Sequence, residues 1–480
     1  MRYLIFGTGD YYNRYKKWFD QQEVVALLDN SEQKQYTRID GIEVLPPMEG
    51  IRLDYDVVVI LSFHFKIMKQ QLIDLGVDEK CIYHFYDLYK LLAEHVVRRP
   101  IQYFNNAENI LKVDSALKMK ILLMSNDLAL GGPAIALFHA AIVLKEYGYE
   151  VVYASMIDGP LREKLFEKDI PIMVDENLQI ATMKGTEWVE SFSLIICNTL
   201  NYHAFLSDRN TAIPVIWWLH DTRFFYDGVK REVMRKIKLD NLSVVSVGLV
   251  PEMAIKEFLP EVQCGKLLYG VADSTANITE IKPSDFVLQK EKLSDFVKIR
   301  FITIGFLEER KGQDILLHAI KKLPDHIRNR CEFYIVGYDE TMFGEEIRRR
   351  SVGISEIIFT GSVDRVKIHE LLSCSDVLIC PSRQDPMPTV AAEAMMHSIP
   401  CIVSDATGTA AYIHEGEDGF IVPMENVLIL AEKIEWCVAN RGRLADIGQK
   451  ARKLYEKYFS MKTFENNFIR VVNEALINKN

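Results

Sequence analysis

The sequence predicts an α/β protein built from Rossmann-like domains, and three short apolar segments carry this prediction. Residues 3–7, 119–125 and 298–305 are each rich in aliphatic or aromatic side chains, as buried strands are. Each segment leads into a turn that contains glycine and then into a helical pattern. Strand, glycine turn and helix in this order are typical of parallel sheets covered by helices.

The most informative motif of the chain lies in its last third, where Asp385 is followed by seven residues and then Glu393. Residues 375–381 form an apolar run that ends in proline, which predicts a buried strand before the motif. Residues 389–396 favour a helix, so Asp385 stands in a loop and Glu393 stands one turn into the helix.

The start of this helix is a candidate anion site. The first turn of a helix has N–H groups without intrahelical partners, and prolines are tolerated there. We therefore expect the backbone around Met387, Pro388 and Thr389 to face a phosphate, and Glu393 to accept hydrogen bonds from two ribose hydroxyls. Asp385 would bind a second sugar. The alternative is an ordinary loop acid and a solvated helix glutamate.

Two adjacent cations, Arg310 and Lys311, follow the strand at 298–305. They precede Gly312 and a helix for which Asp314 is the expected N-cap. Cations at the carboxyl end of a strand are well placed to neutralise a diphosphate leaving group. A solvated charged turn is the alternative, since most charge runs lie on the surface.

The middle of the chain offers a second set of candidates. Gly131 and Gly132 follow the strand at 119–125, and glycine permits the backbone to approach a ligand closely. His220 ends the apolar run at 214–219, and binding sites gather at the carboxyl ends of parallel strands. A simple turn and a structural histidine are the alternatives.

Together these motifs resemble a retaining glycosyltransferase of family 4. The order in that family is a strand with a Lys-Gly turn, a middle strand matched by residues 332–337, the segment with Gly361, the acid-seven-Glu motif, and a turn before residues 418–422. The resemblance implies the GT-B fold, in which two Rossmann-like domains face a cleft. Two positions depart from the family, because Asp385 stands where glutamate is commoner and Phe306 where arginine is usual; we expect Arg310 to supply that cation.

The resemblance also implies an activity. The chain would be a hexosyltransferase that moves a sugar from a nucleotide-diphosphate sugar, with a UDP-sugar favoured, to a glycan or lipid-linked acceptor in cell-surface polysaccharide synthesis. It would need no metal and no cofactor, because the nucleotide sugar is a substrate. Four residues would be catalytic, namely Arg310, Lys311, Asp385 and His220. Eight would bind the donor: Gly131, Gly132, Gly305, Gly361, Met387, Pro388, Thr389 and Glu393.

Composition indicates a large cytoplasmic protein. The 480 residues suffice for about three domains, and 49% of them are hydrophobic. No apolar run approaches the roughly 18 residues of a membrane span, and the start resembles no signal peptide. The eight cysteines form no CxxC pair, which favours reduced thiols, and the net charge of -10 argues against a nucleic-acid partner.

The first 110 residues form a further Rossmann-like unit. They resemble the N-terminal nucleotide-sugar-binding domains of some sugar acetyltransferases. Gly7, Gly9 and Asp29 are candidates for a nucleotide site, although Tyr12 occupies the third glycine position of the dinucleotide fingerprint. Nucleotide binding, oligomerisation and a degenerate fold are the open readings, and we favour a degenerate fold that supports a homo-oligomer.

The domain plan follows from these segments. We expect an accessory domain over residues 1–110, with a linker at 98–106, and an acceptor-side domain over 115–285, closed by the irregular stretch 273–285. A donor-side domain would span 290–455, and a C-terminal helix over 456–480 would cross back to the acceptor side.

Residues 228–238 carry five Lys or Arg side chains and predict a cationic helix on the acceptor-side domain. Such a helix is a candidate for peripheral contact with anionic lipid at the inner face of the membrane, and a solvated helix is the alternative.

A function from another class is also open at this point. The chain could be a non-catalytic, glycosyltransferase-like partner or chaperone of a true enzyme. The presence of Lys311, Asp385 and Glu393 argues against this reading, because a degenerate relative would be free to lose those charges.

Overall fold

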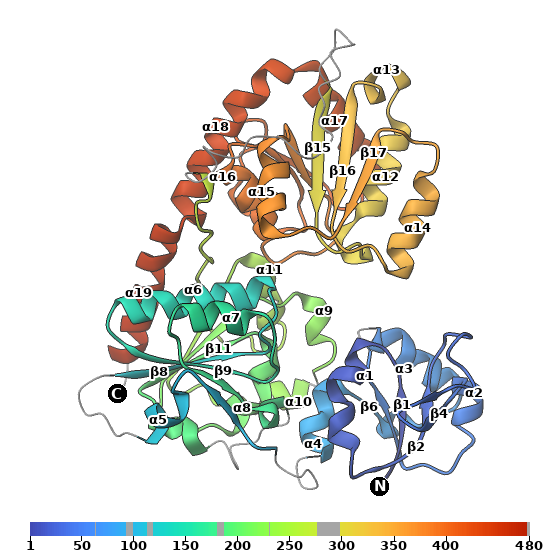
Figure 1. Cartoon of the computed structure of the whole chain (residues 1–480), viewed down its shortest axis with the longest axis vertical. Coiled ribbons are helices and arrows are strands. Elements are labelled where there is room, and N and C mark those ends of the chain that lie inside the picture. The colour runs from blue at the N-terminus through green and yellow to red at the C-terminus, as the bar shows by residue number, and fades with distance from the viewer. Residues whose placement is uncertain are drawn as a thin grey trace.

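The computed structural model describes residues 1–62, 64–92, 99–112, 119–179, 187–229, 231–275 and 298–477. The strands of these residues form three sheets, of six, eight and six strands. Figure 1 shows each sheet in its own body, with the first (blue) beside the second (cyan to green) and the third (yellow to orange) across from the second. The expected α/β architecture with parallel sheets is confirmed.

The first sheet has the order β3-β4-β2-β1-β5-β6, and all its pairs are parallel except β3 with β4. We call this body the accessory domain. Its strands are β1 Arg2–Phe6, β2 Glu23–Leu28, β3 Arg38–Ile39, β4 Ile42–Leu45, β5 Val57–Ile60 and β6 Ile82–His84. Its helices are α1 Asp10–Tyr15, α2 Pro47–Gly50, α3 Phe65–Asp74 and α4 Leu88–Leu92.

The second sheet has the order β14-β13-β12-β11-β8-β9-β10-β7. Its central strands are buried along their whole length, which is why they read as continuous apolar runs. The strands are β7 Gln102–Phe104, β8 Lys120–Ser125, β9 Glu150–Ser155, β10 Ile172–Val174, β11 Leu194–Asn198, β12 Val215–Leu219, β13 Leu242–Ser246 and β14 Cys264–Lys266. The helices are α5 Ala107–Lys112, α6 Gly132–Glu146, α7 Leu161–Glu167, α8 His203–Asp208, α9 Arg223–Tyr226, α10 Arg231–Met234 and α11 Leu249–Lys256.

Strand β7 corrects the expected linker at 98–106. It pairs antiparallel with β10 and closes that edge of the second sheet, so the second body begins before residue 110. A strand of three residues leaves too short an alternation to be recognised, and its partner decides the pairing. Most of the irregular stretch expected at 273–285 lies outside the described residues, which stop at Thr275 here.

The third sheet is parallel throughout, in the order β17-β16-β15-β18-β19-β20. Its strands are β15 Ile299–Ile304, β16 Cys331–Val336, β17 Ile357–Gly361, β18 Val377–Cys380, β19 Cys401–Ser404 and β20 Phe420–Val422. Its helices are α12 Gln313–Lys322, α13 Asp325–Arg328, α14 Met342–Ser351, α15 Arg365–Ser373, α16 Thr389–Met396 and α17 Val427–Ala439. Neighbouring strands β15 and β18 both end at the edge that faces the second body, so the loops that follow them meet there.

The C-terminal helices join the third body to the second. Helix α18 Leu444–Leu454 continues through a π-helical turn at Tyr455–Phe459 into α19 Met461–Ile477, which returns to the second body (Figure 1). There the rings of Phe464 and Phe468 stack on Trp218 of β12, with centroids 5.8 and 6.4 Å away. These buried aromatic contacts hold the two halves of the chain together.

Candidate active site

A cleft of about 290 Å³ lies between the second and third bodies. All four residues that the sequence predicts as catalytic line it: Arg310, Lys311, Asp385 and His220. The predicted donor-binding residues Gly132, Met387, Pro388 and Thr389 line it as well. Segments far apart in the sequence therefore meet in one cavity, because the carboxyl ends of two sheets face each other.

The two cations come from the turn after β15. Lys311 Nζ lies 2.7 Å from Asp385 Oδ2, and Arg310 Nη1 lies 3.9 Å from the same oxygen. Arg310 also donates from Nη1 to the Gln384 carbonyl at 3.1 Å and pairs with Glu308 at 2.6 Å. The predicted cations and the first acid of the motif therefore form one charge cluster.

Gly312 explains the Lys-Gly turn. Its φ of 71° is left-handed, and a Cβ at this position would stand 2.2 Å from the carbonyl oxygen of Pro381. Only glycine lets the turn pack against the chain that leaves β18. Lys311 is thereby held beside Asp385.

Asp314 is not the N-cap of α12, so that expectation is wrong. Gly312 is the cap residue, and the Asp314 carboxylate pairs with Arg383 at 2.7 Å. Although burial opposes it, this ion pair holds the pKa of Asp314 below its usual value. The left-handed turn puts the aspartate inside the first helical turn and not before it.

Helix α16 begins at the cleft as the sequence predicts, with Pro388 as its N-cap residue. Gly132 of the second body lies opposite, because a Cβ on it would stand 3.9 Å from Thr389 Cγ2. The Tyr269 hydroxyl donates to the Met387 carbonyl at 3.0 Å and ties the loop to the second body. The start of the helix therefore faces the cavity at close range.

Glu393 does not line the cleft itself. Its side chain is 3% exposed, one carboxylate oxygen pairs with Arg365 of α15, and Oε2 has no partner within the described part of the chain. A buried acceptor without a partner is costly unless a ligand supplies a donor. Arg365 lies outside the sequence motif, so its contact with Glu393 could not be predicted. Only the fold brings α15 against α16.

His220 directly follows β12 and lies on the second body's side of the cleft. Its ring packs on Trp218 with centroids 4.8 Å apart, and burial lowers its pKa to about 3. Nε2 is buried and finds no hydrogen-bond partner among the residues that the structure describes. His220 is thus a neutral ring that can exchange a hydrogen bond with a ligand.

Two polar neighbours of His220 were missed by the sequence analysis. Burial raises the pKa of Asp221 to about 6, and its Oδ2 accepts from the Leu200 N–H at 2.7 Å. Thr222 is fully buried, and its hydroxyl has no partner in the described ranges. Both line the cleft. The sequence feature that could have identified them is their position after the end of a strand, next to His220.

Three of the predicted glycines do not line the cavity. Gly131 is the N-cap residue of α6, Gly305 lies beneath the Lys311 side chain, and Gly361 ends β17 with a left-handed φ of 68°. Their places are consistent with shaping the turns at the strand ends rather than with direct contact in this cavity.

The accessory residues Gly7, Gly9 and Asp29 lie at the carboxyl end of β1 and β2. Although burial acts against it, hydrogen bonds from Thr8 and Ser31 hold the pKa of Asp29 below its usual value. The Asp29 carboxylate therefore already accepts hydrogen bonds from two residues of its own domain, Thr8 and Ser31.

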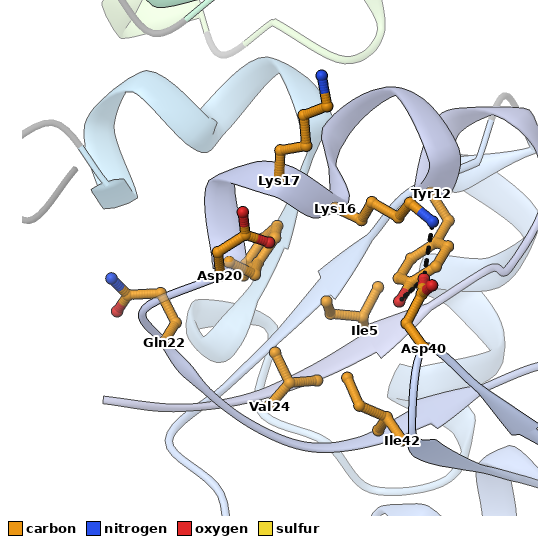
Figure 2. A pocket seen from close by; sticks show the side chains of 10 residues that line it. Ile5, Tyr12, Lys16, Lys17, Asp20, Gln22, Val24, Asp40 and Ile42 are labelled. Carbon is orange, nitrogen blue, oxygen red and sulfur yellow. Dashed lines mark hydrogen bonds and ion pairs between the residues drawn. The ribbon is translucent and has the colours of Figure 1, made fainter. Parts of the chain in front are cut away.

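A larger cavity of the accessory domain, about 430 Å³, lies elsewhere (Figure 2). None of the three predicted residues lines it. Ile5, Val24 and Ile42 form its apolar floor, while Tyr12 and Lys16 both reach Asp40, at 3.0 and 2.8 Å. Tyr12, Lys16 and Asp40 thus already pair with one another.

The basic segment 228–238 is not a cationic helix. Only Arg231–Met234 is helical, Met234 and Ile237 are buried, and Arg231 donates to the Glu257 carbonyl at 2.7 Å. Lys230 lies outside the described residues. Packing of its apolar residues holds the segment in place. A count of its charged residues does not reveal this packing. None of the helices in the described part of the chain has both the length and the apolar character to cross a membrane.

Comparison with known families agrees with this geometry. Residues 288–454 match the model described as glycosyl transferases group 1, and residues 118–247 match glycosyl-transferase family 4. Residues 1–83 match the C2185-like N-terminal domain. The two matches fall in the second and third bodies, which bound the cleft.

Individual relatives agree as well. Spore coat protein SA of Bacillus subtilis is 26% identical over 385 residues, covering 74% of this chain and 99% of that protein. An uncharacterized glycosyltransferase of Haemophilus influenzae is 24% identical, covering 70% of this chain and 94% of that protein. HepE of Anabaena, crystallised with UDP and glucose, superposes with a TM-score of 0.60 at 19% identity, covering 74% of this chain and all of that one.

The structural neighbour establishes the GT-B architecture that the resemblance implied, and the family matches establish the class of enzyme. The protein is therefore a glycosyltransferase of the GT-B fold, with a family 4 domain over residues 118–247, a group 1 domain over residues 288–454 and an additional N-terminal domain.

Proposed function

We propose that the enzyme transfers a sugar from a UDP-sugar to a glycan or lipid-linked acceptor of cell-surface polysaccharide, with retention of configuration and without a metal. One observation carries the proposal: the cleft gathers Arg310, Lys311 and Asp385 from the group 1 domain opposite His220 from the family 4 domain. This set offers positive charge for a diphosphate and polar groups for a sugar.

The donor would lie on the group 1 domain. Its diphosphate would bind between the Arg310–Lys311 turn and the free N–H groups at the start of α16. Glu393 Oε2, buried and without a partner in the described residues, would accept from a ribose hydroxyl. On this proposal the Lys311–Asp385 pair at 2.7 Å opens when the phosphate arrives, which frees Asp385 for the transferred sugar.

In the reaction the acceptor oxygen forms a bond to the anomeric carbon on the face from which the diphosphate leaves. The bond between that carbon and the phosphate oxygen breaks, and the departing phosphate takes the acceptor proton. Arg310 and Lys311 stabilise the charge that develops on the phosphate. Neutral His220, with its pKa lowered to about 3 by burial, orients a sugar hydroxyl without adding charge.

The relatives suggest the donor and the class of product. HepE was crystallised with UDP and glucose, and with UDP-glucose. WaaG, a fold neighbour with a TM-score of 0.54 at 14% identity, is described as a glycosyltransferase of lipopolysaccharide biosynthesis. These names support a UDP-sugar and a cell-surface glycan as the first choices. We also propose a cytoplasmic location, with Arg235, Lys236 and Lys238 exposed for contact with anionic lipid.

The test is a donor screen with a stereochemical readout. The purified chain is incubated with UDP-, GDP- and ADP-glucose, with EDTA or with Mg²⁺, and the anomeric configuration of product is followed by proton NMR. We expect release of UDP only, at equal rates in EDTA and Mg²⁺, and a product with the donor's configuration. Inverted product, or turnover that EDTA abolishes, would refute the mechanism.

A further inference from the structure

The accessory domain contacts the acceptor-side domain at two loops, and both loops border the cleft. Figure 1 shows the accessory domain (blue) beside α9 and α10 (green). The first loop runs from His220 to Gly228 and the second from Asn126 to Gly132. The contacts described below are made by Arg14, Phe65, Lys66 and His84 of the accessory domain, and not by Gly7, Gly9 or Asp29.

The first contact is a hydrogen bond to the backbone of Gly228. His84, at the end of β6, has Nε2 2.5 Å from the Gly228 carbonyl oxygen, while its Nδ1 accepts from the Tyr86 N–H at 3.2 Å. Because Nδ1 is an acceptor, the proton of the neutral ring is on Nε2, which donates to Gly228. A sequence-distant ring thus fixes the end of the loop.

Gly228 is also packed too closely for a side chain. A Cβ would stand 2.4 Å from His84 Cε1 and 2.6 Å from Tyr86 Cδ2. Its φ is not in the left-handed region, so close approach of the accessory domain, rather than backbone conformation, requires glycine here.

Charge and aromatic contacts add to this interface. Lys66 of α3 pairs with Asp227, which also pairs with Arg223 at the start of α9. Phe65 is buried, and its ring centroid lies 6.2 Å from that of Phe224. The accessory domain therefore holds α9 and the residues after it through several independent contacts.

The opposite side of the same loop lines the cleft. His220, Asp221, Thr222 and Phe225 all face the cavity. Only a few residues separate them from Asp227 and Gly228, which the accessory domain holds. A shift at the interface would therefore reach the cavity wall directly.

The second loop is held in a similar way. Arg14 of α1 lies 3.6 Å from Asp127, whose carboxylate accepts from the Ala129 N–H at 3.1 Å. This loop leads to Gly132, which lines the cleft opposite Thr389. Both acceptor-side walls of the cavity are thus supported by one domain.

We infer that the accessory domain is a positioning domain, which holds the loops 126–132 and 220–228 in the shape that binds the acceptor. The role of these loops in acceptor binding rests on the proposed function. The coupling of the loops to the accessory domain does not. On the proposed function the nucleotide of the donor lies on the group 1 domain, so loss of the interface weakens acceptor binding and leaves the affinity for UDP unchanged.

The test uses variants on both sides of the interface in the full-length protein. His84→Leu removes the donor to Gly228, Lys66→Glu reverses the charge facing Asp227, and Gly228→Ala fills the space that His84 and Tyr86 occupy. Lys69→Glu, on the same helix as Lys66 but paired with Glu79 within the accessory domain, is the matched control for charge. Gly442→Ala, with nothing within 4 Å of its Cβ position, is the control for glycine.

Two readouts decide the outcome. In transfer assays we expect KM for the acceptor to rise roughly three- to tenfold in the three variants, as for loss of one or two hydrogen bonds. The dissociation constant for UDP stays at the wild-type value, and His84→Gln, which keeps an N–H donor, recovers part of the loss in acceptor binding. An equal weakening of UDP binding, or no increase in KM for the acceptor, would overturn the inference.

Hydrogen–deuterium exchange supplies a readout that needs no activity. We expect faster exchange in residues 221–228 of His84→Leu and Lys66→Glu than in the controls, and unchanged exchange in α12 and α16. Unchanged exchange in the loop would overturn the inference even in an inactive protein. If wild-type protein transfers no sugar, the proposed function fails, and the exchange data alone decide on the positioning domain. Lys66 is largely exposed, so its variant is expected to fold.

Discussion

Three charged side chains of the cleft lie close together. Arg310 and Lys311 face one buried carboxylate, Asp385, which is 4% exposed. His220 adds no charge, because burial lowers its pKa to about 3. A buried carboxylate needs a close cation, so we expect Lys311 to stabilise the fold in addition to the catalytic role proposed for it.

Replacing Lys311 by alanine tests both roles. We expect Lys311→Ala to lower kcat about 10²- to 10³-fold, since charge stabilisation of the leaving group is lost. Asp385 would lose its nearest cation, so the free energy of unfolding is expected to fall by about 1–3 kcal/mol. Steady-state transfer assays and urea unfolding measure the two effects. Lys322→Ala, an exposed lysine at the end of the following helix, should change neither. If Lys311→Ala turned over at the wild-type rate, Lys311 would not stabilise the diphosphate leaving group.

Glu393 gives a test that separates binding from folding. Glu393→Gln keeps the side-chain shape but weakens the acceptor at the buried oxygen that has no partner in the described residues. We expect the dissociation constant for UDP to rise about ten- to hundredfold, as for a lost charged hydrogen bond. Isothermal titration calorimetry measures it. Glu370→Gln on the neighbouring helix α15 is the control, and equal affinities in the two variants would argue against a ribose contact.

At the scale of elements, two helices connect sequence to site in different ways. Helix α16 is buried from Ala391 to Met396, which its apolar sequence already indicates, and its start faces the cleft. Helix α19 lies far from the cleft in sequence and contacts β12, the strand that ends at His220. Packing of α19 on Trp218 therefore supports the strand that carries the histidine.

The packing of α19 can be tested by shortening one of its buried side chains. Phe468 is fully buried and stacks on both Phe464 and Trp218. We expect Phe468→Ala to lower the free energy of unfolding by about 3–5 kcal/mol, because it leaves a cavity in a close-packed aromatic cluster. Urea denaturation followed by tryptophan fluorescence measures the loss. Ile477→Ala, on the same helix but 75% exposed, should change it by less than about 0.5 kcal/mol. Similar losses in the two variants would mean that α19 does not dock as described.

At the scale of the whole molecule, buried histidines link stability to pH. Burial lowers the pKa of His220 to about 3 and those of His203 and His397 to about 4. The unfolded chain binds protons on these rings below about pH 6.5, and the folded protein does so only at lower pH. Their contribution to stability is therefore complete above pH 6.5 and is lost as the pH falls toward 4.

Asp221 acts in the opposite direction. Burial raises its pKa to about 6, so the folded protein binds this proton more readily than the unfolded chain does. Its contribution grows as the pH falls from about 6 to about 4. The destabilising effect of the three histidines exceeds the stabilising effect of the one carboxylate. The free energy of unfolding should therefore decrease as the pH falls from 6.5 to 4.

The expected outcome is a melting temperature that falls steadily between pH 6.5 and pH 4, measured by differential scanning calorimetry. His220→Gln, which cannot take up a proton, should make the fall shallower. His326→Gln, at an exposed histidine, should leave the slope as in the wild type. A flat profile in the wild-type protein, or an unchanged slope in His220→Gln, would show that these rings do not control acid stability.

Residue patterns predicted the cleft well where chemistry and local structure coincide. His220 directly follows β12, and Lys311 and Asp385 stand in the loops after β15 and β18, where parallel sheets place their sites. Asp221 stands in the same position and was missed, since no local feature distinguishes a buried carboxylate from a solvated one. The Asp314 cap was wrong because Gly312 adopts a left-handed conformation that moves the helix start.

The amino-acid sequence was sufficient to predict the α/β class, the strands that lead to the cleft and the charged residues Arg310, Lys311 and Asp385 that line it. Periodicity and glycine turns are local properties, so they are readable without a partner. Tertiary structure alone decided that Arg365 pairs with Glu393, that Gln102–Phe104 joins the second sheet and that His84 holds Gly228. Each of these contacts joins residues far apart in the chain, and its energy exists only when the fold brings both partners together.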